Sequence, residues 1–520
     1  MGCLLKTLKC IVICVVAVGL TLVVIARCSR LPSLDGRSTS TALFDTADTR
    51  LGTSITPQLE AHPGLSGLYL LPDSRDAFAA RARLAEVAER TLDVQYYIWE
   101  NDMTGRLLFE AVHAAADRGV RVRLLLDDNN TSGLDPVLAA LDSHPNVEVR
   151  LFNPFVIRKP RIGYLTDFFR ANRRMHNKSF TADNQVTIIG GRNIGDEYFG
   201  VAEGSLFVDL DVMAVGPIVH DVSNDFDRYW ASASSYPLDR IVRSVEPARI
   251  ADVSSAAANV AHDPAAAAYI SAIRDSPFIR AVVEKRLDFE WAVTRMISDD
   301  PAKGLGRAPP EKLFPEQLME IIGNPVSDVE LVAGYWVPGT TGMERFLSMA
   351  KRGVKIKVLT NSLEAADGPW VYSGFSKCRK PLLKAGITIY EMRRLSPQKN
   401  DNKVTGPLGS SGSSLHAKTF SVDRSRFFVG SFNFDPRSRK LNTELGFVID
   451  SPVLAQRIEA AFDDSIPANS YEVHLSDTGQ LYWIDRRGDE LVRHDKEPGT
   501  SWSSRVAVWF LSLLPIEWLL

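Results

Sequence analysis

The sequence predicts an α/β protein made of two duplicated α/β/α sandwich halves, and three observations support this fold class. One string of five residue types, beginning at His176, recurs at identical spacing from His416. The segment Arg118–Asp127 (RGVRVRLLLD) is matched by Arg352–Asn361 (RGVKIKVLTN). Strand-like and helix-like segments alternate in both halves, which is typical of mixed, largely parallel sheets covered by helices on both faces. Two copies of one unit therefore form the body of the protein.

The elements of the first half follow from local pattern. Leu92–Trp99 is rich in β-formers and predicts a strand. A helix is expected over Gly105–Arg118, because apolar residues recur there at helical spacing. Gly119 ends that helix, and Val120–Leu126 predicts the next strand.

The second half repeats the plan. Val329–Val337 predicts a strand, a helix runs through Lys351 to Gly353, and Val354–Leu359 predicts the following strand. We therefore divide the chain into a membrane or signal segment (1–30), a linker (31–64), a first half (65–245), a connecting segment (246–325), a second half (326–465) and a C-terminal extension (466–520).

The duplicated string carries residue types that suit one chemistry. Its members are His176, Lys178, Asp183, Gly190 and Asn193 in the first copy, and His416, Lys418, Asp423, Gly430 and Asn433 in the second. Imidazole can attack phosphorus, lysine offers a compact cation to phosphate oxygens, and asparagine adds a donor. Alternation along a strand places each His and Lys on one face. One such string would be explained by a core histidine beside a surface lysine, but two in register favour a shared phosphate site.

These paired strings are the double HKD motif, so the chain resembles the phospholipase D superfamily. Within it, segments such as LDVQYYIWENDMTG, GGRNIGDEYFG and SFNFDPRS are most similar to bacterial cardiolipin synthases. The resemblance implies two α/β/α halves with one active site at their interface. It also implies that His176 is the nucleophile and His416 the general acid, a choice that the symmetric motifs cannot make. One departure is Tyr372, where relatives lead us to expect a histidine; if that histidine recognises the acceptor, acceptor choice differs here.

The resemblance implies a membrane-associated phosphatidyltransferase that makes cardiolipin from phosphatidylglycerol, with phosphatidylethanolamine as a candidate second lipid, through a phosphatidyl-histidine intermediate. The alternative is a phospholipase D-type phosphodiesterase that hydrolyses phospholipid, or less favourably nucleic acid, with water as acceptor. A non-catalytic lipid-binding scaffold is disfavoured by two intact motifs. The sequence leaves open whether an accessory protein takes part.

Each motif histidine needs a partner on its second ring nitrogen to set the tautomer. Glu444 is the candidate for one histidine, and Asp209, with Asp211 as its rival, is the candidate for the other. Asp183 and Asp423 lie an odd number of residues past their histidines, so we expect each to form a structural salt bridge. Gly190 and Gly430 are also expected to be structural. Because no His, Cys or Asp cluster has metal-ligand spacing, we expect neither metal nor cofactor.

Composition and the N-terminus bear on location. A net charge of −3 gives no general attraction to nucleic acid, and no nucleic-acid partner is expected. Cys10–Ala26 is a nearly continuous apolar run, just long enough to span a bilayer. Cleavage as a signal peptide and lipidation at Cys28 are alternatives. We expect a bacterial inner-membrane protein, anchored at its N-terminus, with the catalytic body in the periplasm.

Three further segments are ambiguous. Basic and aromatic residues alternate between Arg158 and Arg174, which favours a lipid-facing surface over a solvated basic face. The Gly- and Ser-rich segment Lys399–Ser414 is either an ordinary loop or a mobile rim over the site. The apolar run Val506–Leu520 suits burial against the body slightly better than insertion into a membrane interface.

Overall fold

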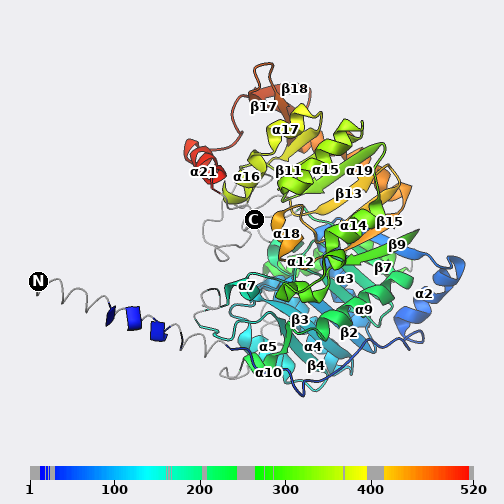
Figure 1. Ribbon diagram of the computed structural model, residues 1–520. Coiled ribbons are helices and arrows are strands. Elements are labelled where there is room, and N and C mark those ends of the chain that lie inside the picture. The colour runs from blue at the N-terminus through cyan, green and yellow to red at the C-terminus, as the bar shows by residue number, and fades with distance from the viewer. Residues whose placement is uncertain are drawn as a thin grey trace, which may run out of the picture.

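A computed structural model of the chain describes residues 30–159, 161, 164, 167–201, 208–242, 264–274, 276–284, 286–366, 369–394 and 415–514, with part of the stretch between 12 and 23. Most of the predicted membrane or signal segment 1–30, including Cys28, lies outside the described residues, as do the segment 399–414 and residues 515–520. Within the described ranges, no helix has both the length and the hydropathy needed to cross a bilayer. The first half lies below the second in Figure 1.

The first half is built on one mixed sheet. Its strand order, from one edge to the other, is β9 (Glu290–Ser298), β1 (Ser66–Leu71), β7 (Asp211–Val215), β6 (Val186–Gly190), β5 (Ser179–Ala182), β2 (Thr91–Ile98), β3 (Arg121–Asn130), β4 (Val147–Phe152) and β8 (Ser235–Pro237). The predicted strands around Leu92–Trp99 and Val120–Leu126 are β2 and β3.

The second half repeats this order. Its sheet runs β9, β15 (Leu445–Asp450), β14 (Arg426–Gly430), β13 (Lys418–Val422), β10 (Asp328–Ala333), β11 (Lys355–Asn361), β12 (Thr388–Met392), β16 (Ser470–Leu475), β17 (Leu481–Arg487) and β18 (Glu490–His494). Strands β15 to β12 pair in the same order as β7 to β4, which confirms the duplication. The connecting segment is part of both sheets, because β9 pairs with β1 and with β15.

The prediction of largely parallel sheets is wrong. Parallel pairing in the described sheets is confined to β2–β3–β4 and β10–β11–β12. The cause is how the motif strands are connected. A parallel neighbour needs a long crossover, whereas β5–β6 and β13–β14 are hairpins joined by short turns, and these pair antiparallel. The alternation of helix and strand revealed only the parallel core of each sheet.

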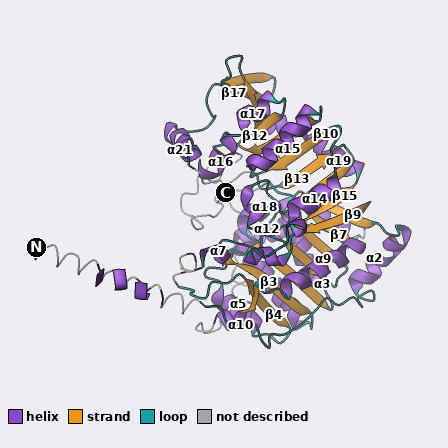
Figure 2. Cartoon of the chain, in the orientation of Figure 1, coloured by secondary structure: helices purple, strands orange, loops and turns teal. Residues whose placement is uncertain are grey.

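Helices cover the sheets in both halves, as Figure 2 shows. Those of the first half and connecting segment are α2 (Arg50–Ala61), α3 (Ser74–Val87), α4 (Met103–Asp117), α5 (Asp135–Asp142), α7 (Phe168–Ala171), α8 (Asp196–Phe199), α9 (Pro217–Trp230), α10 (Leu238–Ile241), α12 (Pro264–Arg274), α13 (Pro277–Val283), the 3₁₀ helices η1 (Pro301–Leu305) and η2 (Pro310–Lys312), and α14 (Phe314–Ile322). Those of the second half are α15 (Gly339–Lys351), α16 (Pro369–Ser376), α17 (Arg379–Lys384), α18 (Pro436–Lys440), α19 (Pro452–Asp463), α20 (Ser465–Asn469) and α21 (Trp502–Ser512).

The two halves share an apolar layer. Val212 of β7 and Ile189 of β6 belong to the same buried cluster as Val429 of β14 and Phe447 of β15. Burying this surface favours association of the halves by about 25 cal/mol per Å² of apolar area. This apolar layer therefore joins the strands that follow the two motif histidines and holds the two halves together there.

The terminal segments also pack on the body. Within the expected linker, Arg37 donates to the carbonyls of Ser232 and Ser235, and α2 begins with Thr49 as its N-cap. At the other end, α21 buries Val508 against the second half but leaves Trp509 63% exposed. The expected burial of the C-terminal run thus applies to one face of α21 only.

Candidate active site

Each motif histidine is held in place by the main chain of the other half. His176 lies three residues before β5 and His416 lies two residues before β13, at the start of the motif hairpins. The His176 N–H donates to the carbonyl of Thr443 at 2.9 Å, and the His416 N–H donates to the carbonyl of Val208 at 2.9 Å. The two motifs therefore meet through reciprocal contacts between the halves.

The side chains of the histidines are paired in the same reciprocal way. His176 Nδ1 lies 2.8 Å from Glu444 Oε2, and His416 Nδ1 lies 2.6 Å from Asp209 Oδ2. All four side chains are buried. A carboxylate on Nδ1 favours the tautomer whose Nε2 lone pair is free to act as nucleophile or base. The structure thus places both sequence-predicted carboxylates where an orienting partner is needed.

Asp211, the rival of Asp209, has a different environment. Its carboxylate lies 2.8 Å from Arg81 Nη2 and 3.5 Å from Arg192 Nη1, in the core of the first half. Asp209 and not Asp211 therefore contacts His416.

Two buried lysines lie close to both histidines. Lys178 Nζ donates to the carbonyl of His176 at 2.6 Å, and Lys418 Nζ donates to the carbonyl of His416. Burial and the charges of Lys178 and Lys418 lower the pKa of His176 well below its ordinary value, and burial together with Lys418 lowers the pKa of His416 to about 3. Each histidine is affected by the lysine of the other half, so the two motifs form one electrostatic site.

The carboxylates differ between the two dyads. Burial raises the pKa of Glu444 to about 7, against the opposing charge of Lys178. Burial alone would also raise the pKa of Asp209, but His416, Lys418 and Arg192 hold it well below its ordinary value. Two motifs with the same residue types therefore have different electrostatics.

The two motif asparagines differ in their hydrogen bonds. Asn193 Nδ2 donates to the hydroxyl of Tyr198 at 3.0 Å, and its Oδ1 accepts from the N–H of Ile98. The Tyr198 ring in turn contacts the His416 ring edge-on, with centroids 5.4 Å apart. Asn433 is buried, and its Oδ1 has no hydrogen-bond partner among the described residues.

The motif glycines allow close approach of the chain. A Cβ at Gly190 would lie 2.6 Å from the Leu210 carbonyl oxygen, and one at Gly430 would lie 2.5 Å from that of Leu445. Neither neighbour is a flexible side chain, so any larger residue would force β6 and β7, or β14 and β15, apart.

The position after each glycine distinguishes the two dyads. A Cβ at Gly191 would lie 2.1 Å from Asp209 Oδ1, so the glycine leaves room for that carboxylate. The equivalent residue of the second motif, Ser431, instead donates its hydroxyl to Glu444 Oε2 at 2.5 Å. The sequence shows this difference as GGRN against GSFN. Its effect could not be predicted from the sequence, because it depends on which carboxylate packs beside Gly191 and which beside Ser431.

The motif aspartates do not form the predicted salt bridges with any described residue. Asp183 instead accepts the backbone N–H groups of Glu89, Arg90 and Thr91, at 3.0, 2.7 and 3.0 Å. Asp423 accepts those of Val326, Ser327 and Asp328 in the same way. Each carboxylate thus ties the turn of its motif hairpin to the chain entering the neighbouring strand.

Sequence reasoning missed a second pair of equivalent residues, Asp127 and Asn361. Asp127 Oδ2 accepts the N–H of Met175 at 2.7 Å, and Asn361 Oδ1 accepts the N–H of Leu415 at 3.0 Å. These two side chains hold the residue that precedes each motif histidine. They are the last residues of the RGVRVRLLLD and RGVKIKVLTN repeats, so the alignment marked their equivalence but not their contacts.

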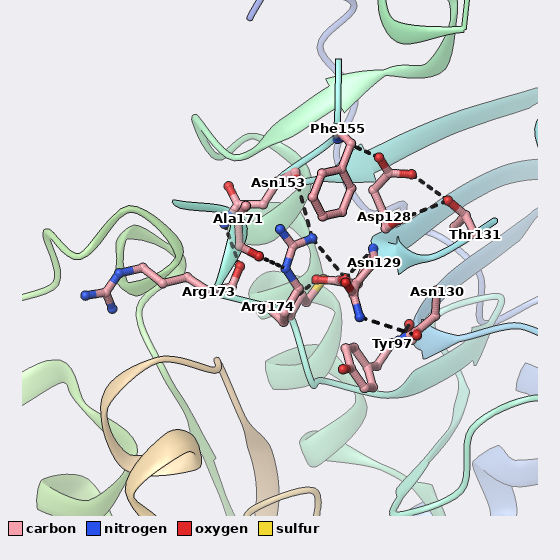
Figure 3. A network of polar contacts seen from close by, with 12 residues as sticks. Tyr97, Asp128, Asn129, Asn130, Thr131, Asn153, Phe155, Ala171, Arg173 and Arg174 are labelled. Carbon is pink, nitrogen blue, oxygen red and sulfur yellow. Dashed lines mark hydrogen bonds and ion pairs between the residues drawn. The ribbon is translucent and has the colours of Figure 1, made fainter. Parts of the chain in front are cut away.

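The expected lipid-facing basic surface is largely absent from the described part of Arg158–Arg174. Arg158 pairs with Asp128 and Asp135, while Arg174 is fully buried and lies 3.3 Å from Asp127. Figure 3 shows Arg174 turned inward, toward Asn153 and Ala171, and Arg173 pointing away. A charge run in sequence does not reveal acidic partners that are distant along the chain. Of the aromatic residues in this run, Phe169 is 83% exposed.

The hydrogen bonds of Tyr372 join it to Glu391 and Arg379 of the second half rather than to the motif histidines. It is buried in the second half, where its hydroxyl contacts Glu391 and accepts from Arg379 Nη1 at 2.7 Å. No group of three or more His, Cys, Asp or Glu side chains among the described residues is arranged to hold a metal ion.

The duplicated site can be compared with known proteins. The sequence profile of the family described as "Cardiolipin synthase, PLD-like domain" matches residues 82–230 and 318–466. These matched segments contain both motifs and cover more than half of the chain. The chain belongs to this cardiolipin synthase, phospholipase D-like family.

Relatives match this family member over nearly its whole length. Cardiolipin synthase C of Escherichia coli (strain K12) is 51% identical over 472 residues, covering 91% of this chain and 100% of the relative. Cardiolipin synthase B of Shigella flexneri is 24% identical over 429 residues, covering 82% and 87%. Among solved structures, phosphatidylserine synthase of Haemophilus influenzae Rd KW20 matches with a TM-score of 0.55 and 12% identity, over 89% of this chain and 99% of the other, which shows a shared fold.

Proposed function

We propose that this protein is a membrane-associated phosphatidyltransferase that makes cardiolipin from phosphatidylglycerol through a phosphatidyl-histidine intermediate. One observation carries the proposal: two buried histidines, each held at Nδ1 by a carboxylate of the other half, share a site with two lysines. The similarity to cardiolipin synthase C over the relative's full length supports the product. Phosphatidylethanolamine is the candidate second lipid.

In the proposed first step, His176 Nε2 attacks phosphorus while the bond to the leaving alcohol oxygen breaks; the alcohol is glycerol if phosphatidylglycerol is the donor and ethanolamine if phosphatidylethanolamine is the donor. His416 donates a proton to that oxygen, and Lys178 and Lys418 stabilise the charge on the phosphate. In the second step the deprotonated His416 takes the proton from a lipid hydroxyl, whose oxygen displaces His176. The second step frees His176 and protonates His416 again, so the enzyme is restored, the phosphatidyl group is bonded to the acceptor oxygen, and the leaving alcohol has departed with a proton.

The unequal dyads support this division of roles. Asp209 is held as an anion beside His416 and acts to raise the pKa of that imidazole, against the lowering by burial and Lys418. Glu444 loses its charge more easily, because its pKa is raised, and so supports a proton on His176 less strongly. A nucleophile must be neutral, which suits His176, whose pKa is lowered by burial and by both lysines. An acid must be protonated, so the role of His416 requires that the negative charge of the bound phosphodiester, together with Asp209, raises its pKa.

The membrane is the proposed location of the reaction. Both lipid substrates reside in a bilayer, and the apolar run Cys10–Ala26 suits an N-terminal anchor in the bacterial inner membrane with the body in the periplasm. On α21, the exposed side chains of Trp502, Trp509 and Phe510 suit the interface of that bilayer. We expect no metal, cofactor or nucleic acid to be required.

The proposal is tested by following labelled phosphatidylglycerol in bilayers that contain the full-length enzyme. We expect cardiolipin as the main product, in the presence of a chelator, and a loss of at least about 10²-fold in His176→Ala and in His416→Ala, because each removes one group from a concerted site. Release of phosphatidic acid alone would show a hydrolase instead. Substantial activity in either variant would contradict the two-histidine mechanism.

A further inference from the structure

The connecting segment contributes directly to the dyad of His176. Strand β9 ends at Ser298, and the next residue, Asp299, exchanges two hydrogen bonds with Glu444. The Asp299 N–H donates to the Glu444 carbonyl at 3.1 Å, and the Glu444 N–H donates to Asp299 Oδ2 at 3.0 Å. These two hydrogen bonds fix the backbone of Glu444, the residue whose carboxylate contacts His176.

Asp299 is in turn held by a buried lysine. Lys303 Nζ, on η1, lies 2.8 Å from Asp299 Oδ2 and donates to the carbonyl of Ser438 at 2.8 Å. The lysine side chain is only 2% exposed. Burying an ammonium group costs free energy that an apolar side chain of similar length would avoid. Its charge therefore needs an explanation, and the adjoining carboxylates provide one.

We propose that Lys303 is a positioning residue for the nucleophile: its charge favours the carboxylate form of Glu444, and it holds Asp299, which fixes the Glu444 backbone, so that Glu444 accepts the Nδ1–H of His176. The ring becomes cationic when Nε2 bonds to phosphorus, and a carboxylate on Nδ1 stabilises that charge. This inference rests on the proposed function, because it takes His176 as the nucleophile.

The charges around Glu444 come from both halves and from the connecting segment. The charged and titratable groups around it are His176 and Lys178 of the first motif, Lys303 and Asp299 of the connecting segment, and Asp435 of the second half. Ser431 donates its hydroxyl to Glu444 Oε2. Burial raises the pKa of Glu444 to about 7, and Lys178 and Lys303 act against that rise. Removing the charge of Lys303 must therefore raise the pKa of Glu444 further.

The test compares Lys303→Met and Lys303→Gln with Lys303→Arg, by measuring kcat/KM against pH. Cardiolipin synthesis and cleavage of a soluble nitrophenyl phosphodiester are measured in parallel. Without the charge of Lys303, Glu444 is protonated at higher pH. The acid limb of the kcat/KM profile should therefore move upward by about one pH unit, which lowers kcat/KM about tenfold at a given pH on that limb. Lys303→Arg keeps the charge and should restore the wild-type limb. Lys303→Gln keeps hydrogen-bonding capacity, so it still tests the charge if Lys303→Met does not fold.

Lys357→Met is the matched control, because Lys357 pairs with Glu330 and Asp463 away from the motifs. It should leave the limb unchanged. An unmoved limb in Lys303→Gln, or an equal shift in Lys357→Met, would overturn the inference. Suppose that the wild-type enzyme cleaves the soluble diester but makes no cardiolipin, and that the Lys303 variants shift the acid limb of this cleavage as expected. The proposed function then fails and the positioning role stands. If the wild-type enzyme makes cardiolipin and the limb does not move, only the positioning role fails.

Discussion

At the scale of the residue, each motif histidine depends on a carboxylate from the other half, and the two carboxylates lie in different surroundings. Asp209 lies beside a cationic network that includes Arg192, whereas Glu444 lies among Ser431, Asp299 and Lys303. Equivalent motifs can thus perform different steps, since the asymmetry resides in the second layer of side chains.

These surroundings predict a narrow pH optimum. Glu444 must be deprotonated and Lys178 protonated for the proposed reaction, and both have a pKa of about 7 because of burial. As pH falls, Glu444 takes a proton and activity is lost; as pH rises, Lys178 loses its proton and activity is lost again. We expect a bell-shaped profile of kcat/KM with both limbs near neutrality.

Lys178→Arg separates the two limbs, because guanidinium stays protonated throughout this range. The basic limb should move to higher pH while the acid limb stays. If the acid limb of the wild-type enzyme were instead found near pH 4, the buried Glu444 would not be the group that controls it.

A second prediction at this scale concerns Asp127. Asp127→Asn keeps an acceptor for the Met175 N–H but leaves the fully buried Arg174 without its carboxylate. Breaking one partner of a buried pair costs about 3–5 kcal/mol. We expect a lower melting temperature and, since His176 follows this segment, a fall in kcat of about ten- to a hundredfold.

Asp93→Asn is the control for that prediction. Asp93 forms a buried ion pair with Arg123 at 2.7 Å, and this ion pair includes no residue of the motif segments. Its loss should lower the melting temperature and leave kcat of the folded enzyme unchanged. An equal fall in kcat in both variants would mean that Asp127 acts only through stability.

At the scale of the element, the motif hairpins are fixed by their turns. Asp183 and Asp423 both adopt a positive φ of 51°. The carboxylate of Asp183 accepts hydrogen bonds from backbone N–H groups of the chain that enters β2, and that of Asp423 does so from the chain that enters β10. Sequence periodicity identified their strands but suggested cationic partners, because it could not show that three amides of a distant segment converge on each carboxylate.

The two turns predict unequal losses of stability. Asp183 is fully buried, so Asp183→Ala leaves amides without an acceptor and should cost about 1–3 kcal/mol. Asp423 is only partly buried, and water can replace it, so Asp423→Ala should cost about 1 kcal/mol or less. Thermal unfolding of both variants measures the difference; equal losses, or a greater loss in Asp423→Ala, would contradict this account.

At the scale of the whole molecule, the duplication predicted most of the fold and nearly all of the site. The spacing of the motifs identified both histidines and both lysines, and the position of Glu444 and Asp209 after the motifs suggested the orienting carboxylates. Three features depended on contacts distant in sequence. They are the crossing of each carboxylate to the other half, the membership of β9 in both sheets, and the inward pairing of Arg158 and Arg174.

The inward pairing of those arginines also changes how membrane contact should be sought. Exposed apolar side chains include Phe169 on α7, Trp502, Trp509 and Phe510 on α21, and Leu513 directly after α21. In Figure 1 both α7 and α21 lie toward the left edge of the molecule. Aromatic side chains of this kind favour the polar–apolar boundary of a bilayer, so membrane contact is expected there in addition to the N-terminal segment.

Holding the site at a bilayer predicts the outcome of the second step. Lipid hydroxyls are concentrated at the membrane, which raises the effective concentration of the acceptor over water without any new contact. A chain beginning at Arg30 keeps the segment that packs on the first half, including Arg37 and α2, and removes only the predicted anchor. In dilute detergent this shortened chain should release more phosphatidic acid, relative to cardiolipin, than the full-length enzyme in bilayers. The ratio is measured from labelled phosphatidylglycerol, and the shortened chain added to the same bilayers serves as control, where its ratio should recover in proportion to the fraction bound. An unchanged ratio in detergent would show that the site itself, rather than its location, excludes water from the phosphatidyl-histidine.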